Sequence, residues 1–344
     1  MGKDEFLKLR QEYDSEDMRQ DILSTPMLAL NGYKIVEAMN LGRLKGKHLN
    51  IILAGMGGSG IAGLLLKNYL SDEKTMILCV QDYKLPSAAD KHSLVIACSY
   101  SGNTEETLSI FKDARRRSCG LIAVTSGGKL GEYAKASGTL IISLPSGHQP
   151  RAAMTTEFFA MLRLLERLRL ISNKSGEVMS LKDELKKQLG VLEENAKILS
   201  EKLVNKIPLV YTSKSFEAVG YRWKCQFNEN SKIMAFSNVL PESNHNELEG
   251  YENLRGDYHA VILRFDQDHR RVQRRIRLTK ETMIRKGISD TEIGIRGASM
   301  LSKMFSAVIL GDLTSYYLAL RLKTNPSKVS IIEDFKQELG PYVA

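Results

Sequence analysis

Cysteine is scarce in this chain, with four among 344 residues. No Cys-x-x-Cys pair or metal-ligand spacing joins them; they are Cys79, Cys98, Cys119 and Cys225. Three of the four lie in or beside apolar segments of strand length, which favours buried free thiols in a reducing compartment. We therefore expect neither a disulfide framework nor a metal site built on cysteine.

Signals for export and for membrane insertion are also lacking. The first five residues, Met-Gly-Lys-Asp-Glu, are too charged for a secretory signal peptide. The uncharged stretch Leu49–Leu66 has the length of a membrane span, but its five glycines favour a strand, a loop and a helix. We expect a cytoplasmic protein with no membrane contact.

The composition is that of a globular protein, with 43% hydrophobic and 26% charged residues. The net charge of +9 suits an anionic substrate, and it also suits nucleic acid. Basic residues concentrate in His269–Arg277, where Val272, Ile276 and Met283 fall on one helical stripe and leave the arginines on a solvated face. Since no helix-turn-helix, zinc-finger or RNA-binding signature accompanies this segment, we expect no nucleic-acid partner.

Short apolar strands alternate with helices from residue 49 to 144, and the alternation restarts at Ile207. This rhythm predicts parallel sheets covered on both faces. The expected fold class is therefore α/β, with two doubly wound, flavodoxin-like subdomains. We expect domains at 1–170 and 181–344, joined by a linker at 171–180 that is rich in Asn, Gly and Ser.

Two loops carry the pattern of a phosphate site. The apolar run Leu94–Cys98 breaks into Ser-Tyr-Ser-Gly-Asn-Thr at 99–104, and a helix is expected from Glu105. Free main-chain N–H groups and the helix dipole favour an anion at such a point. Ser99, Ser101 and Thr104 add hydroxyl donors, although ordinary helix capping would also use such residues.

The second loop is Gly-Met-Gly-Gly-Ser-Gly at 55–60, after the predicted strand Leu49–Ala54. Glycines let the backbone approach a ligand closely. The acidic residue of a dinucleotide fingerprint is only loosely matched by Asp82, and no Lys-Ser/Thr follows the glycines as a nucleotide triphosphate loop requires. Because ligands bind beyond the carboxyl ends of parallel strands, we expect Gly57, Gly58 and Ser59 to share one anion with the other loop.

The two motifs together resemble the sugar isomerase (SIS) domain, and nearly the whole chain resembles the bifunctional phosphoglucose/phosphomannose isomerases of archaea and some bacteria. The resemblance implies a homodimer that interconverts glucose 6-phosphate, and also mannose 6-phosphate, with fructose 6-phosphate without a metal or cofactor. Glucose-specific relatives have a glutamine where this chain has Val329. Strict glucose specificity is therefore not expected.

The chemistry needs a base for the proton between two carbons, an acid/base pair for ring opening and a cation for the enediolate. The resemblance implies Glu229 as the base, with Glu247 as its rival. It implies His245, donated by the neighbouring subunit, and Lys336 for ring opening, and Arg151 as the cation. His148 is a weaker candidate for the site.

Each of these residues also has an ordinary structural explanation. Glu229 reads as a surface residue near a helix end, and Arg151 as a first-turn helix residue. Lys336 adjoins a stripe of Ile332, Phe335 and Leu339, which we expect to face a core. For the whole chain two alternatives stay open: a non-catalytic sugar-phosphate sensor controlling transcription, and an SIS isomerase for another sugar phosphate.

Overall fold

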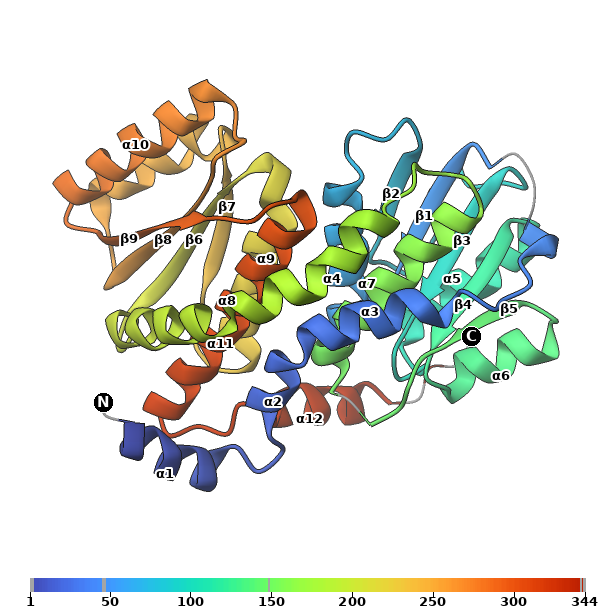
Figure 1. Ribbon diagram of the computed structural model, residues 1–344, viewed down its shortest axis with the longest axis horizontal. Helices are drawn as coiled ribbons and strands as arrows, with labels where there is room; N and C mark the ends of the chain where they lie inside the picture. The colour runs from blue at the N-terminus through green and yellow to red at the C-terminus, as the bar shows by residue number, and fades with distance from the viewer. Residues whose placement is uncertain (1–2, 45–47, 148, 341, 343–344) are drawn as a thin grey trace. The chain divides into compact units, whose positions relative to one another are not determined.

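The computed structural model describes residues 3–44, 48–147, 149–340 and 342. The chain divides into two compact units (Figure 1). The first unit comprises Thr25–Lys182 and the residues from Leu339 onward, and the second comprises Met1–Ser24 and Asp183–Glu338. The structure differs from the predicted division in two respects: residues 1–24 group with the second unit, and the long helix α8 (Ser175–Lys202) begins inside the segment predicted as a linker.

The first unit contains a five-stranded parallel sheet in the order β2-β1-β3-β4-β5, the flavodoxin-like order. Its strands are β1 (Asn50–Ala54), β2 (Met76–Val80), β3 (Ser93–Cys98), β4 (Gly120–Thr125) and β5 (Leu140–Ser143). Its helices are α3 (Thr25–Ile35), α4 (Gly57–Tyr69), α5 (Glu105–Arg116), α6 (Gly128–Ala136) and α7 (Pro150–Arg167), with a 3-10 turn at Gly42–Leu44. The expected doubly wound architecture is confirmed for this unit.

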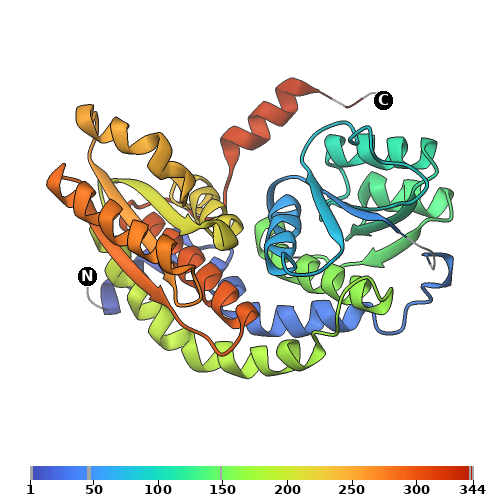
Figure 2. The ribbon, with the colours of Figure 1, turned by 90° about the horizontal axis from the view of Figure 1, so that it is seen from above.

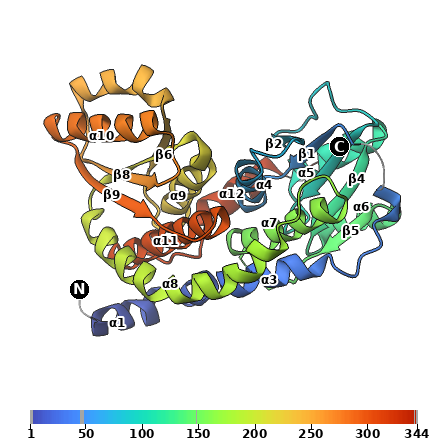
Figure 3. The same cartoon turned by 45° about the horizontal axis from the view of Figure 1, so that its top comes forward.

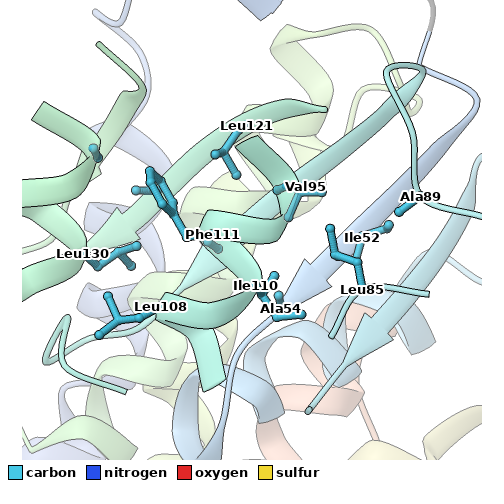
Figure 4. Packing of buried hydrophobic residues seen from close by; sticks show 14 residues of the cluster. Ile52, Ala54, Leu85, Ala89, Val95, Leu108, Ile110, Phe111, Leu121 and Leu130 are labelled. Carbon is cyan, nitrogen blue, oxygen red and sulfur yellow. The ribbon is translucent and has the colours of Figure 1, made fainter. Parts of the chain in front are cut away.

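Helices cover both faces of the first sheet (Figures 2 and 3). Helix α4 lies on β1 and β2 and packs against α7, while α5 and α6 lie on β3, β4 and β5. Alternate strand side chains explain the two layers, since Ile52 and Val95 belong to one cluster with Leu108, Phe111 and Leu130 of α5 and α6 (Figure 4). A strand buried on both faces reads as a nearly continuous apolar run, as β3 does from Leu94 to Cys98.

The second unit contains a four-stranded parallel sheet in the order β7-β6-β8-β9. Its strands are β6 (Ile207–Ser213), β7 (Phe236–Leu240), β8 (Tyr258–Phe265) and β9 (Ser289–Ile295). Its further elements are α1 (Lys3–Tyr13), α2 (Met18–Leu23), α9 (Glu217–Glu229), α10 (Arg270–Arg285), α11 (Met300–Arg321) and α12 (Ser330–Leu339), with 3-10 turns η2 (Lys214–Phe216), η3 (Glu242–His245) and η4 (Glu247–Asn253). The strand order repeats that of the first sheet's opening strands, as two related halves require.

Two packing details of the second unit concern α9, which carries the predicted base Glu229, and α10. The indole N–H of Trp223 on α9 donates to the Ala307 carbonyl of α11 at 2.8 Å, and Gly311 leaves room for that ring. On α10, Ile276 and Met283 are buried while Arg270, Arg271 and Arg274 are exposed. The predicted apolar stripe and solvated arginine face of α10 are therefore confirmed.

Candidate active site

The two predicted phosphate turns contact each other. Strands β1 and β3 pair in parallel with Ala54 opposite Ala97, so the turns that follow them leave the same edge of the sheet at adjoining positions. A Cβ atom on Gly55 would lie 2.8 Å from the Cys98 carbonyl oxygen, and the Tyr100 N–H donates to Ser59 Oγ at 3.3 Å. This adjacency is what the sequence predicted for two loops that share one anion.

The first turn leads directly into α4. Gly57 is exposed and has a left-handed φ of +50°, and a Cβ atom there would meet nothing within 4 Å. The N-cap residue, Met56, provides no side-chain hydrogen bond to the first-turn N–H groups. An anion can therefore approach these N–H groups closely, at the end of the helix where the dipole favours negative charge.

The second turn gathers hydroxyl groups at the start of α5. Ser99 Oγ lies 2.9 Å from Thr104 Oγ1 and accepts the Gly102 N–H at 3.1 Å. Ser101 is exposed, and its Oγ accepts the Asn103 N–H at 3.3 Å. Thr104 is the N-cap of α5 and makes no capping bond through its side chain. Several donors thus surround one helix N-terminus, which is more than one cap needs.

The hydroxyl of Ser59 points inward. It donates to Oε1 of Glu157 at 2.7 Å, and Glu157 is fully buried on α7. Burial, together with the nearby Glu157 carboxyl, raises the pKa of Cys98 well above its ordinary value. The Ser59 hydroxyl therefore ties the first turn to α7, and its main-chain N–H is the group that an anion would contact. The sequence offered one signal for Glu157: it is the single charged residue in the stretch Ala152–Leu162 of α7.

Arg151 belongs to the same unit as both turns. It is the second residue of α7 and is only 6% exposed. A cation in the first turn of a helix opposes the helix dipole, and burying it adds to the cost. A functional reason for Arg151 is therefore favoured over an ordinary surface role. His148, the weaker candidate nearby, lies outside the described residues.

Glu229 is the last residue of α9 and is half-buried. The Cys225 thiol, burial and, last, the charge of Glu229 raise the pKa of Tyr221 above its ordinary value. The two residues after it are buried and bonded to α11: the Asn230 amide donates to Ser315 Oγ at 2.9 Å, and Ser231 Oγ donates to the Ser315 carbonyl at 2.7 Å. The helix end that carries Glu229 is thus firmly held.

The rival base, Glu247, is engaged within the second unit. The Tyr211 hydroxyl donates to one of its carboxylate oxygens and the Asn238 amide donates to the other. Tyr211 also lies 3.0 Å from the Tyr251 hydroxyl, and this group lines a cavity of about 370 Å³. Burial, followed by the Glu247 charge, raises the pKa of Tyr211 far above its ordinary value. These contacts give Glu247 a structural role.

The two predicted ring-opening residues are exposed. His245 lies on η3, and Lys336 lies on α12. The prediction that the stripe beside Lys336 faces a core is wrong, since Ile332, Phe335 and Leu339 are 42%, 63% and 57% exposed. An amphipathic pattern shows which face is apolar, and it does not show what covers that face.

Two absences hold for residues 3–44, 48–147, 149–340 and 342. In that part of the chain no three His, Cys, Asp or Glu side chains gather in a way that would hold a metal ion. No helix among the same residues combines the length and apolarity that crossing a bilayer requires.

The sheet order and the paired phosphate turns define an SIS-domain protein. The SIS domain family matches residues 44–169, and the family described as the bacterial phospho-glucose isomerase C-terminal SIS domain matches residues 192–339. A bifunctional phosphoglucose/phosphomannose isomerase of Caldicellulosiruptor bescii is 37% identical over 338 residues, which cover 94% of this chain and 99% of the relative. The chain belongs to the bifunctional phosphoglucose/phosphomannose isomerase family.

Two further comparisons agree with this membership. The relative from Thermoplasma volcanium with the same name is 37% identical over 300 residues, which cover 86% of this chain and 93% of the relative. The crystal structure of tagatose-6-phosphate ketose/aldose isomerase from Escherichia coli superposes with a TM-score of 0.72 at 15% identity, covering 91% of this chain and 95% of that one. The structural likeness shows a shared fold.

Proposed function

We propose that this protein interconverts glucose 6-phosphate, and also mannose 6-phosphate, with fructose 6-phosphate. The observation that carries the proposal is the contact between two phosphate-type turns, in a chain that belongs to the family of bifunctional isomerases. The substrate phosphate would bind the first-turn N–H groups of α4 and the hydroxyls at the start of α5. The residues that we assign to it are Gly57, Gly58, Ser59, Ser99, Ser101 and Thr104.

We assign the chemistry to four side chains. His245 and Lys336 open the sugar ring by moving a proton between the hydroxyl on C1 and the ring oxygen. The Glu229 carboxylate then takes the proton from C2 of the open-chain aldose and returns it to C1, while the C1 oxygen gains a proton and the C2 hydroxyl loses one; the intermediate is a cis-enediol. Arg151 stabilises the negative charge that develops on oxygen in between. Ring opening breaks the bond between C1 and the ring oxygen, and the remaining steps are proton transfers; the four side chains supply the acids, bases and cation for all of them, so the proposed mechanism calls for no metal or cofactor.

The surroundings of the two candidate carboxylates support Glu229 over Glu247. Both oxygens of Glu247 accept hydrogen bonds, from Tyr211 and from Asn238. A carboxylate with both oxygens engaged in this way must give up a hydrogen bond before it can contact a substrate proton. Glu229 is the last residue of α9, and the two residues that follow it are bonded to α11, so the main chain that carries its carboxylate has a fixed position.

The assay is direct. Purified protein is incubated with fructose 6-phosphate after metal chelation, and both aldose phosphates are measured; we expect glucose 6-phosphate and mannose 6-phosphate to form.

Glu229→Gln should lower kcat by roughly 10²- to 10⁴-fold, the usual contribution of a general base. Glu247→Gln is the matched control and should retain most of kcat. A metal requirement, or the reverse pattern for the two glutamates, would contradict the mechanism. Sugar-phosphate binding without turnover would favour a sensor, and turnover of another sugar phosphate alone would favour a different SIS isomerase.

We further propose a homodimer in which His245 is donated to the neighbouring subunit's site. Mixing inactive Glu229→Gln and His245→Ala proteins tests this. Half of the randomly exchanged dimers would be mixed, and each mixed dimer would hold one intact site, so activity should recover to about 25% of the wild type. If both residues serve their own subunit, no mixed dimer has an intact site and activity does not recover.

The location that we propose is the cytoplasm. The cysteines support it, because Cys98 is buried and free, and Cys79, Cys119 and Cys225 are also unpaired. Free thiols persist where the compartment is reducing. Fractionation of the producing cells, with the protein detected by antibody, tests this assignment, and recovery in an exported fraction would contradict it.

A further inference from the structure

Tyr100 lies in the middle of the second phosphate turn, and none of the roles above uses its side chain. It is only 7% exposed. Its N–H donates to Ser59 Oγ at 3.3 Å, and its carbonyl accepts the Ser126 N–H at 3.0 Å and the Ser126 hydroxyl at 2.7 Å. Its phenol donates to the Pro145 carbonyl at 2.9 Å. Tyr100, which follows β3, thus contacts the segments that follow β1, β4 and β5.

The phenol contact is the part of this arrangement that a side chain alone provides. Pro145 is exposed and begins the loop between β5 and α7, and Arg151 follows it by six residues. Arg151 lies in the first turn of α7, where the helix has few of its own hydrogen bonds and frays most easily. The bond from Tyr100 to Pro145 gives this loop a fixed point next to the phosphate turns.

A second connection reaches α7 further along. The Ser59 hydroxyl, which accepts the Tyr100 N–H, donates in turn to Glu157 at 2.7 Å. Tyr100 is therefore connected to α7 at two places. One connection runs through Pro145, which precedes the helix, and the other runs through Ser59 to Glu157, which lies within the helix. Two such points fix the orientation of a helix end as well as its distance.

We propose that Tyr100 is a positioning residue for Arg151: its phenol holds the loop before α7, and so aligns the guanidinium with a phosphate bound on the adjoining turns. The proposal rests on the proposed isomerase function. Tyr100 does not touch the substrate in this role. Through this contact the phosphate-binding turns and Arg151, the cation that stabilises the enediolate, belong to one rigid frame. A rigid frame of this kind lets an enzyme avoid reorganisation during the reaction.

The test is Tyr100→Phe, which deletes the phenol oxygen and retains the ring and all main-chain bonds. Because small misplacements of a catalytic group are costly, we expect kcat to fall by roughly 10- to 100-fold while KM changes little. Tyr133→Phe is the matched control: this half-buried phenol on α6 has the Lys112 ammonium 5.0 Å from its ring centre and should leave activity unchanged. In an Arg151→Ala background, Tyr100→Phe should cause no further loss.

Amide hydrogen exchange in the first turn of α7 gives a readout that does not depend on turnover. Exchange at residues 151–154 should be faster in Tyr100→Phe than in Tyr133→Phe. Unchanged exchange, or an equal loss of kcat in the presence and absence of Arg151, overturns the proposal. If the wild-type protein converts no sugar phosphate, the isomerase function fails, and the exchange comparison alone decides for or against the role of Tyr100.

Discussion

Two glycines of the phosphate turns have similar backbone conformations and very different surroundings. Gly57 has φ +50° and Gly102 has φ +69°. A Cβ atom on Gly57 would meet nothing within 4 Å, whereas one on Gly102 would lie 1.9 Å from the Gly127 carbonyl oxygen and 2.9 Å from Thr125 Oγ1. Alanine at these two positions therefore separates the cost of the conformation from the cost of the contact.

The magnitudes follow from this difference. Alanine in a left-handed conformation costs about 1–2 kcal/mol, and that is the whole expected cost for Gly57→Ala. Gly102→Ala adds overpacking against backbone, about 1–3 kcal/mol, for a total of about 2–5 kcal/mol. Such a loss is a large part of the 5–15 kcal/mol that ordinarily stabilises a domain.

The effect on KM should be larger for Gly57→Ala than for Gly102→Ala, the reverse of the order expected for stability. The open space over Gly57 is where we expect the substrate phosphate, so a methyl group there would displace it from a main-chain N–H. Loss of one hydrogen bond to a charged group costs about 1.5–3 kcal/mol, which is roughly a 10- to 150-fold rise in KM. Whatever Gly102→Ala protein remains folded should have the smaller change in KM.

Urea denaturation followed by circular dichroism measures the stability of both variants. Tryptophan fluorescence is unsuitable, because the single tryptophan, Trp223, lies in the second unit. Isomerase kinetics on the same preparations give KM. Equal destabilisation by the two substitutions, or a Gly57→Ala enzyme with the wild-type KM, would refute the reasoning.

Two further predictions concern the second unit. The buried Arg222 guanidinium donates to both carboxylate oxygens of Asp312, at 3.1 and 2.9 Å, and Asp312→Asn removes that negative charge. We expect a loss of about 3–5 kcal/mol in urea unfolding followed by Trp223 fluorescence, and a loss below about 1 kcal/mol would contradict it. Burial, aided by the Lys202 charge, lowers the pKa of His259 below its ordinary value of 6.5. As the pH falls through about 6.5, the unfolded chain therefore takes up a proton on His259 before the folded protein does. The free energy of unfolding that neutral His259 contributes is full above pH about 6.5 and falls as the pH is lowered. His259→Gln should therefore show a smaller shift in urea midpoint between pH 7.5 and pH 5.5 than the wild type.

Elements with strong local patterns were predictable from the sequence. The run Tyr258–Phe265 has the length and composition typical of a buried strand and is β8, and the helix predicted from Glu105 is α5. Boundaries that depend on distant partners were not predictable. The apolar residues of Ile233–Phe236 favour a strand there, yet the strand lies at Phe236–Leu240, because its pairing with β6 begins at Phe236 opposite Leu209.

The start of α8 shows a signal that was present and misjudged. Asn173, Ser175 and Gly176 suggested a linker, yet the Asn173 side chain accepts the Ser175 N–H at 2.8 Å in the manner of a helix cap. Asn and Ser are common both in loops and at helix starts, and only the residues that follow distinguish the two. The apolar spacing from Val178 onward was the evidence for a helix start.

The site was predictable as to residue types and not as to side-chain direction. Adjacent parallel strands bring the two turns together, and the motifs alone predicted this. Whether the Ser59 hydroxyl meets a phosphate or the buried Glu157 depends on packing 98 residues away along the chain. The link from Tyr100 to Pro145 depends likewise on where β5 ends relative to β3.

The grouping of residues 1–24 with the second unit has a consequence during synthesis. Phe6 packs edge-on against Tyr317 with ring centres 4.9 Å apart, and the Tyr316 hydroxyl donates to Asp14 at 2.9 Å. A ribosome adds about 5–20 residues per second, so these first helices wait roughly 15–60 s for their partners to be made. Residues 6–14 therefore dock long after they are made, and during that interval the ring of Phe6 lacks its contact with Tyr317.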